Sequence, residues 1–552
     1  MVNLAFRSVV VLGILFGLMF AVLIAALYAA DLPSGVALPL ALGLAVGMAA
    51  LQFAISPVIL QWILKINWME PEMVSPRLGS ALRQMCLERR LPVPRFGIIE
   101  DGNPNAFTFG HWPSDARLVL TRGLVEMCDE EETEAVMAHE LGHIAHWDFV
   151  VMTVAATVPL VLYVIYRFGI RAGRGRGKSS GAIVLVALGA FIAYLISEYV
   201  VLFLSRVREY YADQFSAVVT RNPNALASAL VKIAYGLART QLAVADKQHA
   251  EKSLVAAGGA KMMGIFDPKF GSSMALAAAG SYRESTRSYD HQTTLNARRW
   301  DLWNPWAWFA EVKSSHPLPA KRLKALDRLA EMMGQRPMYD LPQRQPESYW
   351  DEFATDLFFN YVPVLGLLLG GGAALAFAGV KEESLLLVAG AALGGWALGN
   401  LIHLRFAYPK DEFPSREVSD LVGEVKVSYI RCKPATLRGK IIGRGIPGLY
   451  WSEDLVIHDG SGFMTMDYRQ PLPILEFLFG LFRADSFVGE NVVARGWYRR
   501  YPVPFLELWK VQLPDGTTHT CHNWALKFWG TIVALVVAAF IVLFGTGMVL
   551  GG

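Results

Sequence analysis

The stretch Asp129–Asp148, DEEETEAVMAHELGHIAHWD, carries two histidines, His139 and His143, four residues apart on a predicted helix. Residues at this spacing lie on one helical face, so both imidazoles can point at one ion. Glu140 stands beside them and can accept a proton from a water bound to that ion. The pattern HExxH is typical of a zinc site with two neutral histidine ligands, an open metal position and a general base.

The residues around the motif support a helix. Carboxylates fill its predicted first turn, where the helix dipole favours negative charge, and apolar residues follow at helical spacing: Asp129, Glu130, Glu131, Glu132, Ala135, Val136, Ala138, Leu141 and Ile144. Gly142 is expected to leave room beside the metal. A chance match on a core helix is the alternative, at a frequency on the order of one chain in a hundred for this histidine content. A second piece of evidence is therefore needed.

Residues 205–213, SRVREYYAD, supply a second signal and are also predicted to be helical. Glu209 and Asp213 are four apart and share a helical face. Two histidines plus a glutamate from a second helix form a catalytic zinc ligand set, and Asp213 can orient a ligand histidine. The alternative is a solvated helix whose charges pair with one another, but the upstream motif favours a metal. One zinc ion per chain is expected on His139, His143 and Glu209.

Composition indicates a membrane protein. The 552 residues are 53% hydrophobic, and the mean hydropathy is +0.34, more apolar than in ordinary soluble domains. The net charge of +3 gives no reason to expect a nucleic-acid partner. The four cysteines form no CxxC pair, which argues against a cysteine zinc site or a disulfide framework and is compatible with a reducing compartment: Cys86, Cys128, Cys432 and Cys521.

Apolar runs long enough to cross a bilayer divide the chain. They predict transmembrane hairpins at 1–65, 149–204 and 357–404 and a C-terminal transmembrane segment at 528–550. The hairpin at 149–204 separates two soluble stretches, residues 66–148 and residues 205–356, which carry the two halves of the metal site. The metal is therefore expected near the bilayer surface. Because the hairpin at 357–404 is rich in Gly and Ala, its helices can approach closely.

The soluble stretches contain further predicted elements. The first has a helix at 77–91 and strands at 96–100, 105–110 and 117–121. The second has a helix at 222–237 and a long loop at 262–308. A helix with a proline-set start follows in residues 314–326, SSHPLPAKRLKAL. His316 and Arg322 in this segment are candidates for stabilising an oxyanion. From spacing alone, a capping histidine and a surface arginine are the simpler interpretation.

Residues 415–522 are predicted to form a β-rich domain. Strands are expected at 423–430, 439–446, 455–468 and 491–500, with turns at Pro447-Gly448, Asp459-Gly460 and Asp515-Gly516. Short strands at this spacing suggest a small barrel, of which the OB type is one form. OB barrels can bind nucleic acid, but this stretch does not combine a dense basic groove with regularly placed aromatics. A structural or protein-contacting role is therefore favoured.

Four ordered motifs resemble the HtpX-like and CAAX-prenyl-protease family of integral-membrane zinc metallopeptidases, peptidase family M48. They are NPNAFTFG at 103–110, HELGH at 139–143, SRVREYYAD at 205–213 and SHPLPAKRL at 315–323, and the likeness covers roughly residues 36–326. The resemblance implies a gluzincin-type α+β catalytic domain inserted between transmembrane hairpins. By the same likeness, His139, His143 and Glu209 would hold zinc and Glu140 would be the general base.

The resemblance implies roles for other residues as well. The segment Asn105, Ala106, Phe107 and Thr108 would form an edge strand that holds the substrate backbone by strand addition. His316 and Arg322 match the family pattern HPxxxxR and would contact the transition state. Family members with the HtpX-like layout act in membrane-protein quality control. The spans after residue 357 and the β-rich domain depart from the family pattern.

We therefore expect a mainly α, multi-pass membrane protein that hydrolyses peptide bonds in protein or peptide substrates, membrane proteins above all. Glu140 would accept a proton from the attacking water, and His316 or Arg322 would help to hold the oxyanion. Two alternatives are a prenyl-CAAX-type processing protease and a non-catalytic zinc-holding membrane scaffold whose working part is the β-rich domain. The oligomeric state is left open.

Basic residues beside the spans favour the cytoplasmic side of a bacterial inner membrane for the active site. They are Arg7, Lys65, Arg206, Arg208, Arg405, Lys410 and Lys527. The basic loop at 167–178 would then lie outside, which violates the same rule. Either the topology is inverted or the hairpin at 149–204 does not cross fully.

Overall fold

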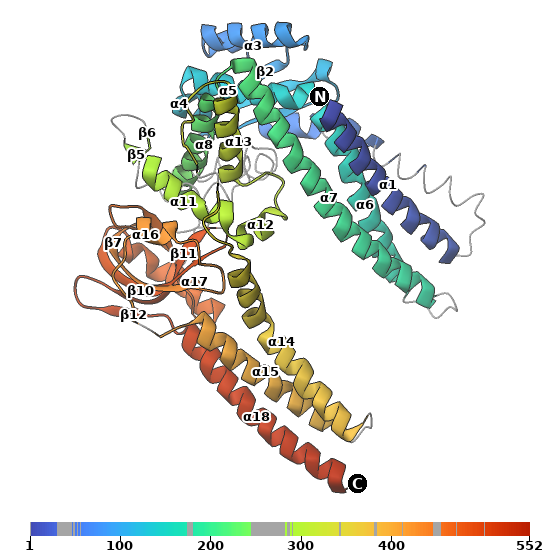
Figure 1. Ribbon diagram of the computed structural model, residues 1–552, viewed down its shortest axis with the longest axis vertical. Coiled ribbons are helices and arrows are strands. Elements are labelled where there is room, and N and C mark those ends of the chain that lie inside the picture. Colours follow the sequence, from blue (N-terminus) through green and yellow to red (C-terminus); the bar gives the residue numbers. More distant parts are fainter. Residues whose placement is uncertain are drawn as a thin grey trace. The chain divides into compact units, whose positions relative to one another are not determined.

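The computed structural model describes residues 2–29, 43, 47, 50, 51, 53–55, 57–173, 180–243, 282, 283, 288, 289, 291–341, 344–379, 384–410, 412–444, 454–470, 472–501 and 503–551. The chain divides into two compact units (Figure 1). The first comprises Met1–Leu237, Gln248–Gly271 and Phe309–Leu341; the second comprises Ala238–Lys247, Ser272–Trp308 and Pro342–Gly552. Several predicted features fall wholly or partly outside the described residues: part of the return span at 36–64, residues 174–178 of the basic loop, part of the loop at 262–308 and the turn at Pro447-Gly448. The prediction of a loop is wrong for His291–Trp303, which forms a helix.

Three long apolar helices of the first unit lie side by side: α1 (Val2–Ala29), α6 (Asp148–Ala172) and α7 (Ser180–Thr220) (Figure 1). Their shared core includes Leu15, Met19, Val158, Leu162 and Leu204. In the second unit, α14 (Trp350–Ala378), α15 (Leu385–Ala407) and α18 (Asn523–Gly551) are also long and apolar. Within the described ranges, these six helices are long and apolar enough to cross a membrane.

Helix α7 is longer than the sequence suggested. The apolar segment at 182–204 and the motif helix at 205–213 were expected as separate elements, but the structure has one continuous helix. No glycine or proline interrupts residues 190–213, so nothing in the sequence breaks the turn-to-turn hydrogen bonds. Glu209 and Asp213 are therefore carried on a rigid extension of a membrane-length helix.

The sheet of the first unit positions the HExxH helix. Its order is β1 (Asn67–Trp68), β2 (Arg95–Ile99), β4 (Arg117–Thr121) and β3 (Ala106–Phe109), with β2 and β4 parallel and β3 antiparallel to β4. The three longer strands lie where the sequence predicted them. Strand β3 forms one edge and packs against α5 (Glu130–Ala145), the helix that carries HExxH. The shorter helices around the sheet are η1 (Pro71–Met73), α3 (Pro76–Arg89), η2 (Pro113–Asp115) and α4 (Arg122–Met127).

A capping box starts α5. The Asp129 side chain accepts a hydrogen bond from the Glu132 N–H, and the Glu132 carboxylate accepts one from the Asp129 N–H, which satisfies two of the helix's unpaired donors. Glu132 also accepts hydrogen bonds from Ser228 and Lys232 of α8 (Pro223–Ala243). The start of the HExxH helix is therefore tied to a second helix as well as to its own backbone.

Gly142 serves helix packing, which corrects the expectation that it leaves room beside the metal. A Cβ atom at this position would lie 3.0 Å from Ala212 Cα and 3.2 Å from Phe215 Cβ, both on α7. The missing side chain thus lets α5 and α7 approach closely. This contact fixes the spacing between the helix that carries the two histidines and the helix that carries Glu209.

The membrane-length helices of the second unit also meet through glycines. A Cβ atom at Gly366 of α14 would lie 2.1 Å from the carbonyl oxygen of Gly395 on α15. The close approach predicted from the Gly- and Ala-rich sequence is thereby confirmed. Further elements of this unit are β5 (Tyr282–Arg283), β6 (Ser288–Tyr289), α11 (His291–Trp303) and α16 (Val418–Gly423). The short helix α12 (Pro305–Glu311) leads back into the first unit, which also holds α13 (Pro319–Met332).

The β-rich part closes into a barrel. Its strands are β7 (Lys433–Arg444), β8 (Leu455–His458), β9 (Phe463–Asp467), β10 (Asn491–Arg500), β11 (Pro504–Gln512) and β12 (Thr518–Thr520). Pairing runs β10-β7-β8-β9-β11 and returns from β11 to β10, with β9 and β11 parallel. Helix α17 (Pro473–Phe482) and η5 (Ala484–Phe487) lie between β9 and β10 in the sequence. This connectivity is that of an OB-like barrel.

One predicted strand of this barrel is wrong. Residues 423–430 follow the short helix α16 and form bends, and the first strand begins only at Lys433. The carbonyl oxygens of Tyr429 and Ile430 accept hydrogen bonds from the Arg499 guanidinium, and Val427 O accepts one from the Trp300 indole. Side chains thus take backbone acceptors that a strand would present to a neighbouring strand.

Substituting Gly142 with Val should destabilise the first unit by about 1–3 kcal/mol, because the added side chain meets the backbone of α7. The midpoint of thermal unfolding in detergent measures this loss. Gly181→Ala on α7 is the control, since a Cβ atom there meets nothing within 4 Å. Equal unfolding midpoints for Gly142→Val and the wild type would show that α5 and α7 do not depend on this contact.

Candidate metal centre

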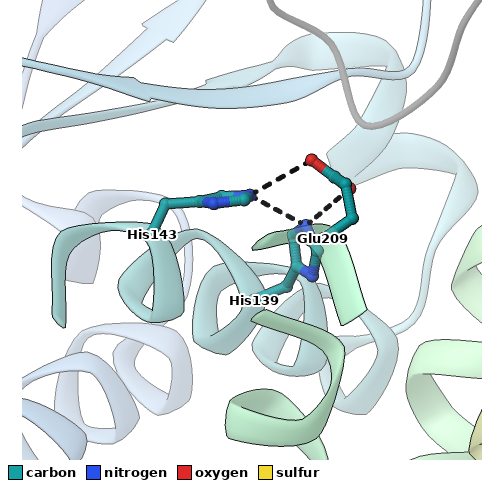
Figure 2. Close-up of side chains that lie close together, drawn as sticks. All are labelled: His139, His143 and Glu209. Atoms are coloured by element: carbon teal, nitrogen blue, oxygen red, sulfur yellow. Dashed lines mark hydrogen bonds and ion pairs between the residues drawn. The ribbon is translucent and has the colours of Figure 1, made fainter. Parts of the chain in front are cut away.

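Three side chains converge on one point between α5 and α7 (Figure 2). The Nε2 atoms of His139 and His143 are 3.2 Å apart, and the Glu209 carboxylate oxygens lie 3.7 Å and 3.6 Å from them, respectively. Nitrogens and oxygens at these separations surround the space that a single metal ion would occupy. In the part of the chain that the structure describes, this is the one group of three His, Cys, Asp or Glu side chains whose ligand atoms all lie within 4.8 Å of one another.

A carboxylate stands behind each histidine. Asp213 Oδ1 lies 3.0 Å from His139 Nδ1, and Asp148 Oδ2 lies 2.6 Å from His143 Nδ1. A carboxylate at Nδ1 favours the tautomer with the proton on that nitrogen, which leaves the Nε2 lone pair free to bind metal. With both rings in this tautomer, two lone pairs and a carboxylate face one another, and only a cation between them satisfies all three.

Asp148 reaches His143 because the chain reverses sharply after α5. Trp147 has φ of 59°, in the left-handed region that few non-glycine residues adopt, and α6 begins at the next residue. Arg208 of α7 then donates from Nε to Asp148 Oδ1 over 2.6 Å and from Nη1 to Ser8 Oγ of α1. Asp148 was not among the site residues predicted from the sequence. Its position directly after the HExxH helix is the feature from which its contact with His143 could have been predicted.

Arg322 of α13 supports the second carboxylate. It is fully buried and donates to both oxygens of Asp213, at 2.9 Å from Nε and 2.6 Å from Nη2, while its Nη1 lies 3.3 Å from Glu209 Oε2. The interpretation as a surface arginine is therefore wrong. Burial would lower the pKa of this guanidinium, but Asp213 and Glu209 raise it, so Arg322 stays charged. Its donors point at Asp213, which faces His139, and at Glu209 of the candidate ligand set.

His316 lies on the other side of Glu209, with its Nδ1 3.2 Å from Glu209 Oε1. The loop that carries His316 is held by Arg206 of α7, whose Nη1 donates to the carbonyl oxygens of Glu311, Val312 and Ser314 over 2.9, 3.2 and 2.7 Å. The sequence placed Arg206 among the basic residues beside the spans. In the structure, its hydrogen bonds join the Glu209 helix to the His316 loop.

The buried charges around the three candidate ligands are negative in sum, which favours a bound cation. Four buried carboxylates stand against two buried guanidiniums, which leaves a surplus of two negative charges: Asp148, Asp213, Glu140 and Glu209 against Arg208 and Arg322. Desolvation alone would lower the pKa of His143, but the hydrogen bond with Asp148 and the nearby Glu209 and Glu140 raise it to about 9, so that without a metal this ring takes up a proton in the place of the cation. The donor set therefore fits a divalent metal such as zinc, for which two histidines and a glutamate are a common catalytic ligand set.

Glu140 faces the same cavity as the three ligands. The cavity has a volume of about 260 Å³ and is also lined by Thr108, Phe109 and His316. Thr108 Oγ1 donates to Glu140 Oε2 over 3.1 Å, which joins the edge strand β3 to the glutamate of the HExxH motif. The predicted residues His139, Glu140, His143, Glu209, Asp213, Thr108 and His316 are thus brought together, and Arg322 lies behind them.

The other residues of the predicted edge strand, Asn105, Ala106 and Phe107, do not place their side chains in the cavity. The side chains of Ala106 and Phe107 are buried, and in the described part of the chain β3 pairs with one strand only, β4. Asn105 lies just before β3 and accepts a hydrogen bond from the Thr121 N–H at its carbonyl oxygen. The backbone of β3 thus has an outer edge beside the cavity.

Comparison with known proteins identifies relatives of this site. A model of Peptidase family M48 matches residues 74–330. The chain is similar to the Protease HtpX homolog of Methanothermobacter thermautotrophicus, at 39% identity over 191 residues, which covers 35% of this chain and 71% of that protein. The Protease HtpX homolog 2 of Methanosarcina mazei is 33% identical over 223 residues, covering 39% and 76%.

The Protease HtpX homolog of Aeropyrum pernix is 30% identical over 290 residues, covering 51% of this chain and 84% of that protein. The family match includes the described residues that form the metal centre, from β3 through α5 and α7 to Arg322. Together with six helices of membrane-spanning length, these findings lead to one conclusion: the chain is an integral membrane protein that belongs to peptidase family M48.

Proposed function

We propose that this protein is a zinc-dependent endopeptidase of the membrane that hydrolyses peptide bonds in membrane proteins as part of their quality control. The observation that carries the proposal is the convergence of His139, His143 and Glu209 on a cavity that also exposes Glu140 beneath the edge of β3. A zinc ion held there would acidify a water molecule and polarise the substrate carbonyl.

Glu140 is proposed as the general base and acid. Its carboxylate takes the proton of the attacking water as the oxygen–carbon bond forms, and then delivers that proton to the amine nitrogen as the carbon–nitrogen bond breaks. The hydrogen bond from Thr108 to Glu140 Oε2 holds the carboxylate in the cavity while the other oxygen can face the water.

Strand β3 is proposed to bind the substrate backbone. An extended peptide can add to its outer edge through main-chain hydrogen bonds, which gives affinity with little dependence on sequence. This mode suits a protease that degrades damaged proteins of many sequences. The buried side chains of Ala106 and Phe107 anchor the strand in the domain core and leave its backbone for the substrate.

His316 is proposed to contact the oxyanion, because it lines the cavity beside Glu209. Arg322 is proposed as a positioning residue in place of the transition-state contact expected from the sequence motif. Its guanidinium is buried against Asp213 and Glu209 and does not line the cavity. It therefore acts on the reaction by orienting His139, through Asp213, and the metal ligand Glu209.

The proposed location of the active site is the cytoplasmic side of a bacterial inner membrane. The positive-inside rule supports it through basic residues near the ends of the apolar segments: Arg7, Lys65, Arg405, Lys410 and Lys527. The native cysteines are buried, so a cysteine introduced at the exposed Glu131 can be labelled selectively. Labelling by a membrane-impermeant reagent in intact cells would refute the cytoplasmic assignment.

Substituting Glu140 with Gln should lower hydrolysis of an unfolded membrane-protein substrate by about 10²–10⁴-fold, because the amide cannot take up the proton. Bound zinc should stay at one ion per chain, since the three ligands are unchanged. Purified full-length protein in detergent is assayed for cleavage, and its metal content is measured by atomic absorption.

Glu131→Gln is the matched control, with the same chemical change on an exposed position of the same helix. Zinc binding without cleavage in both the wild type and Glu140→Gln would favour the non-catalytic scaffold. Cleavage of a prenylated CAAX peptide in preference to the unfolded membrane protein would favour the processing protease.

Substituting Asp148 with Asn should weaken zinc binding by about 10–100-fold, because His143 loses the carboxylate that fixes its tautomer. Titration against zinc buffers gives the Kd. Asp115→Asn is the control, since Asp115 forms a similar pair with His111 at 2.9 Å outside the cluster. If the two variants bind zinc equally well, Asp148 has no role in the metal centre.

A further inference from the structure

A second cavity, of about 610 Å³, lies within the second unit where α15 and α18 meet the barrel. On α15 its lining runs from Trp396 to Ala407, at the C-terminal end of the helix. This stretch measures about 16 Å along the helix axis. On α18 it includes Leu526, Lys527, Gly530 and Thr531, in the first turns. Because both helices are long enough to cross the membrane, the cavity lies at the boundary between hydrocarbon and water.

The polar end of this cavity holds three cations and one carboxylate: Arg469, Arg499, Lys527 and Glu507. Both oxygens of Glu507 are already engaged. Oε1 accepts a hydrogen bond from Tyr408 Oη over 2.8 Å, and Oε2 accepts one from Arg499 Nε over 2.7 Å. The charge of Glu507 is therefore already shared by Tyr408 and Arg499, and a ligand cation would have to compete with them.

Two of the three cations are also engaged. Arg499 donates to the carbonyl oxygens of Ala407 and Ile430, both over 2.7 Å, in addition to Glu507. Arg469 Nε lies 2.7 Å from Asp467 Oδ2. The two guanidiniums are thus balanced by one carboxylate each.

Lys527 differs from these arginines. Its Nζ donates to the neutral Tyr408 Oη over 2.9 Å, and no carboxylate in the described ranges lies within 4.0 Å of it. The polar end therefore has three cations, Arg469, Arg499 and Lys527, against two paired carboxylates, Asp467 and Glu507, which leaves one positive charge in excess. The opposite end is formed by the indole of Trp396, the Cα of Gly530 and the hydrogen-bonded pair Asn400 and Thr531.

We propose that this cavity binds one anionic phospholipid, with its phosphate beside Lys527 and Arg469 and its glycerol and first acyl carbons along Trp396 and Gly530. The excess positive charge favours a ligand with a net negative charge. A zwitterionic headgroup would bring its own ammonium group to a site that already holds three cations. Basic pockets beside transmembrane helices are a known means of binding anionic headgroups, and the hydrocarbon side favours a lipid over a soluble phosphate.

The test uses delipidated full-length protein in detergent and counts retained lipids by native mass spectrometry. Palmitoyl-oleoyl phosphatidylglycerol is the probe, and the phosphatidylcholine of the same chains is the zwitterionic comparison. We expect one phosphatidylglycerol to be retained preferentially. Lys527→Gln should weaken its binding about fivefold, as expected for one lysine near an anionic headgroup.

Lys410→Gln is the matched control. Lys410 also lies beside the start of α18, 4.0 Å above the Trp524 ring, but it does not line the cavity. Binding should be unchanged in this variant. Equal losses in the two lysine variants, or equal retention of the two lipids, would overturn the proposal in favour of general attraction to lipid headgroups.

Gly530→Phe provides a second variant that keeps every charge. A Cβ atom at Gly530 meets nothing within 4 Å, so the helix accepts a side chain there, and the ring would fill the cavity. Phosphatidylglycerol retention should fall to the phosphatidylcholine level with the unfolding midpoint preserved. Unchanged retention in this variant contradicts the proposal even if Lys527→Gln fails to fold. Displacement of the lipid by inorganic phosphate alone would identify a free anion as the ligand and also overturn it.

Discussion

The metal centre depends on burying more carboxylates than guanidiniums around two histidines. Asp148, Asp213, Glu140 and Glu209 lie together out of water, and Arg208 and Arg322 offset two of the four negative charges. Buried charges of one sign are costly unless they are paired. The remaining charge is stabilised when a divalent cation lies between His139, His143 and Glu209, so that the arrangement of these helices and the binding of a metal support each other.

These ion pairs also connect the parts of the first unit. Arg208 joins α7 to the start of α6 and to α1, Arg322 joins α13 to α7, and Arg206 joins α7 to the loop before α13. Helix α7 takes part in each of these contacts and is also continuous with a membrane-length segment. A peptide bond cut at Glu140 would therefore be cut close to the bilayer, which suits the proposed membrane-protein substrates.

The cavity of the second unit also has an excess of charge, but there the excess is positive. At the junction of α15, α18 and the barrel, the three cations Arg469, Arg499 and Lys527 face two carboxylates, Asp467 and Glu507. The negative excess in the first unit supports the proposed metal cation, whereas the positive excess in the second supports the proposed anionic headgroup. In both cases, the balance of carboxylates against cationic side chains favours one charge of ligand.

The sequence by itself determined the local features: the HExxH helix, the three main strands of the sheet, the long apolar helices and most of the barrel strands. Each depends on spacing or composition over a few residues. The tertiary structure alone decided that α7 is one continuous helix that includes Glu209, and that the missing side chain of Gly142 lets α5 pack closely against α7. It also decided that carbonyl groups in residues 423–430 accept hydrogen bonds from side chains, and that Arg322 is buried. Asp148 and Arg206 also gained their roles only there, because a charged side chain acts through partners that the fold brings from distant parts of the chain.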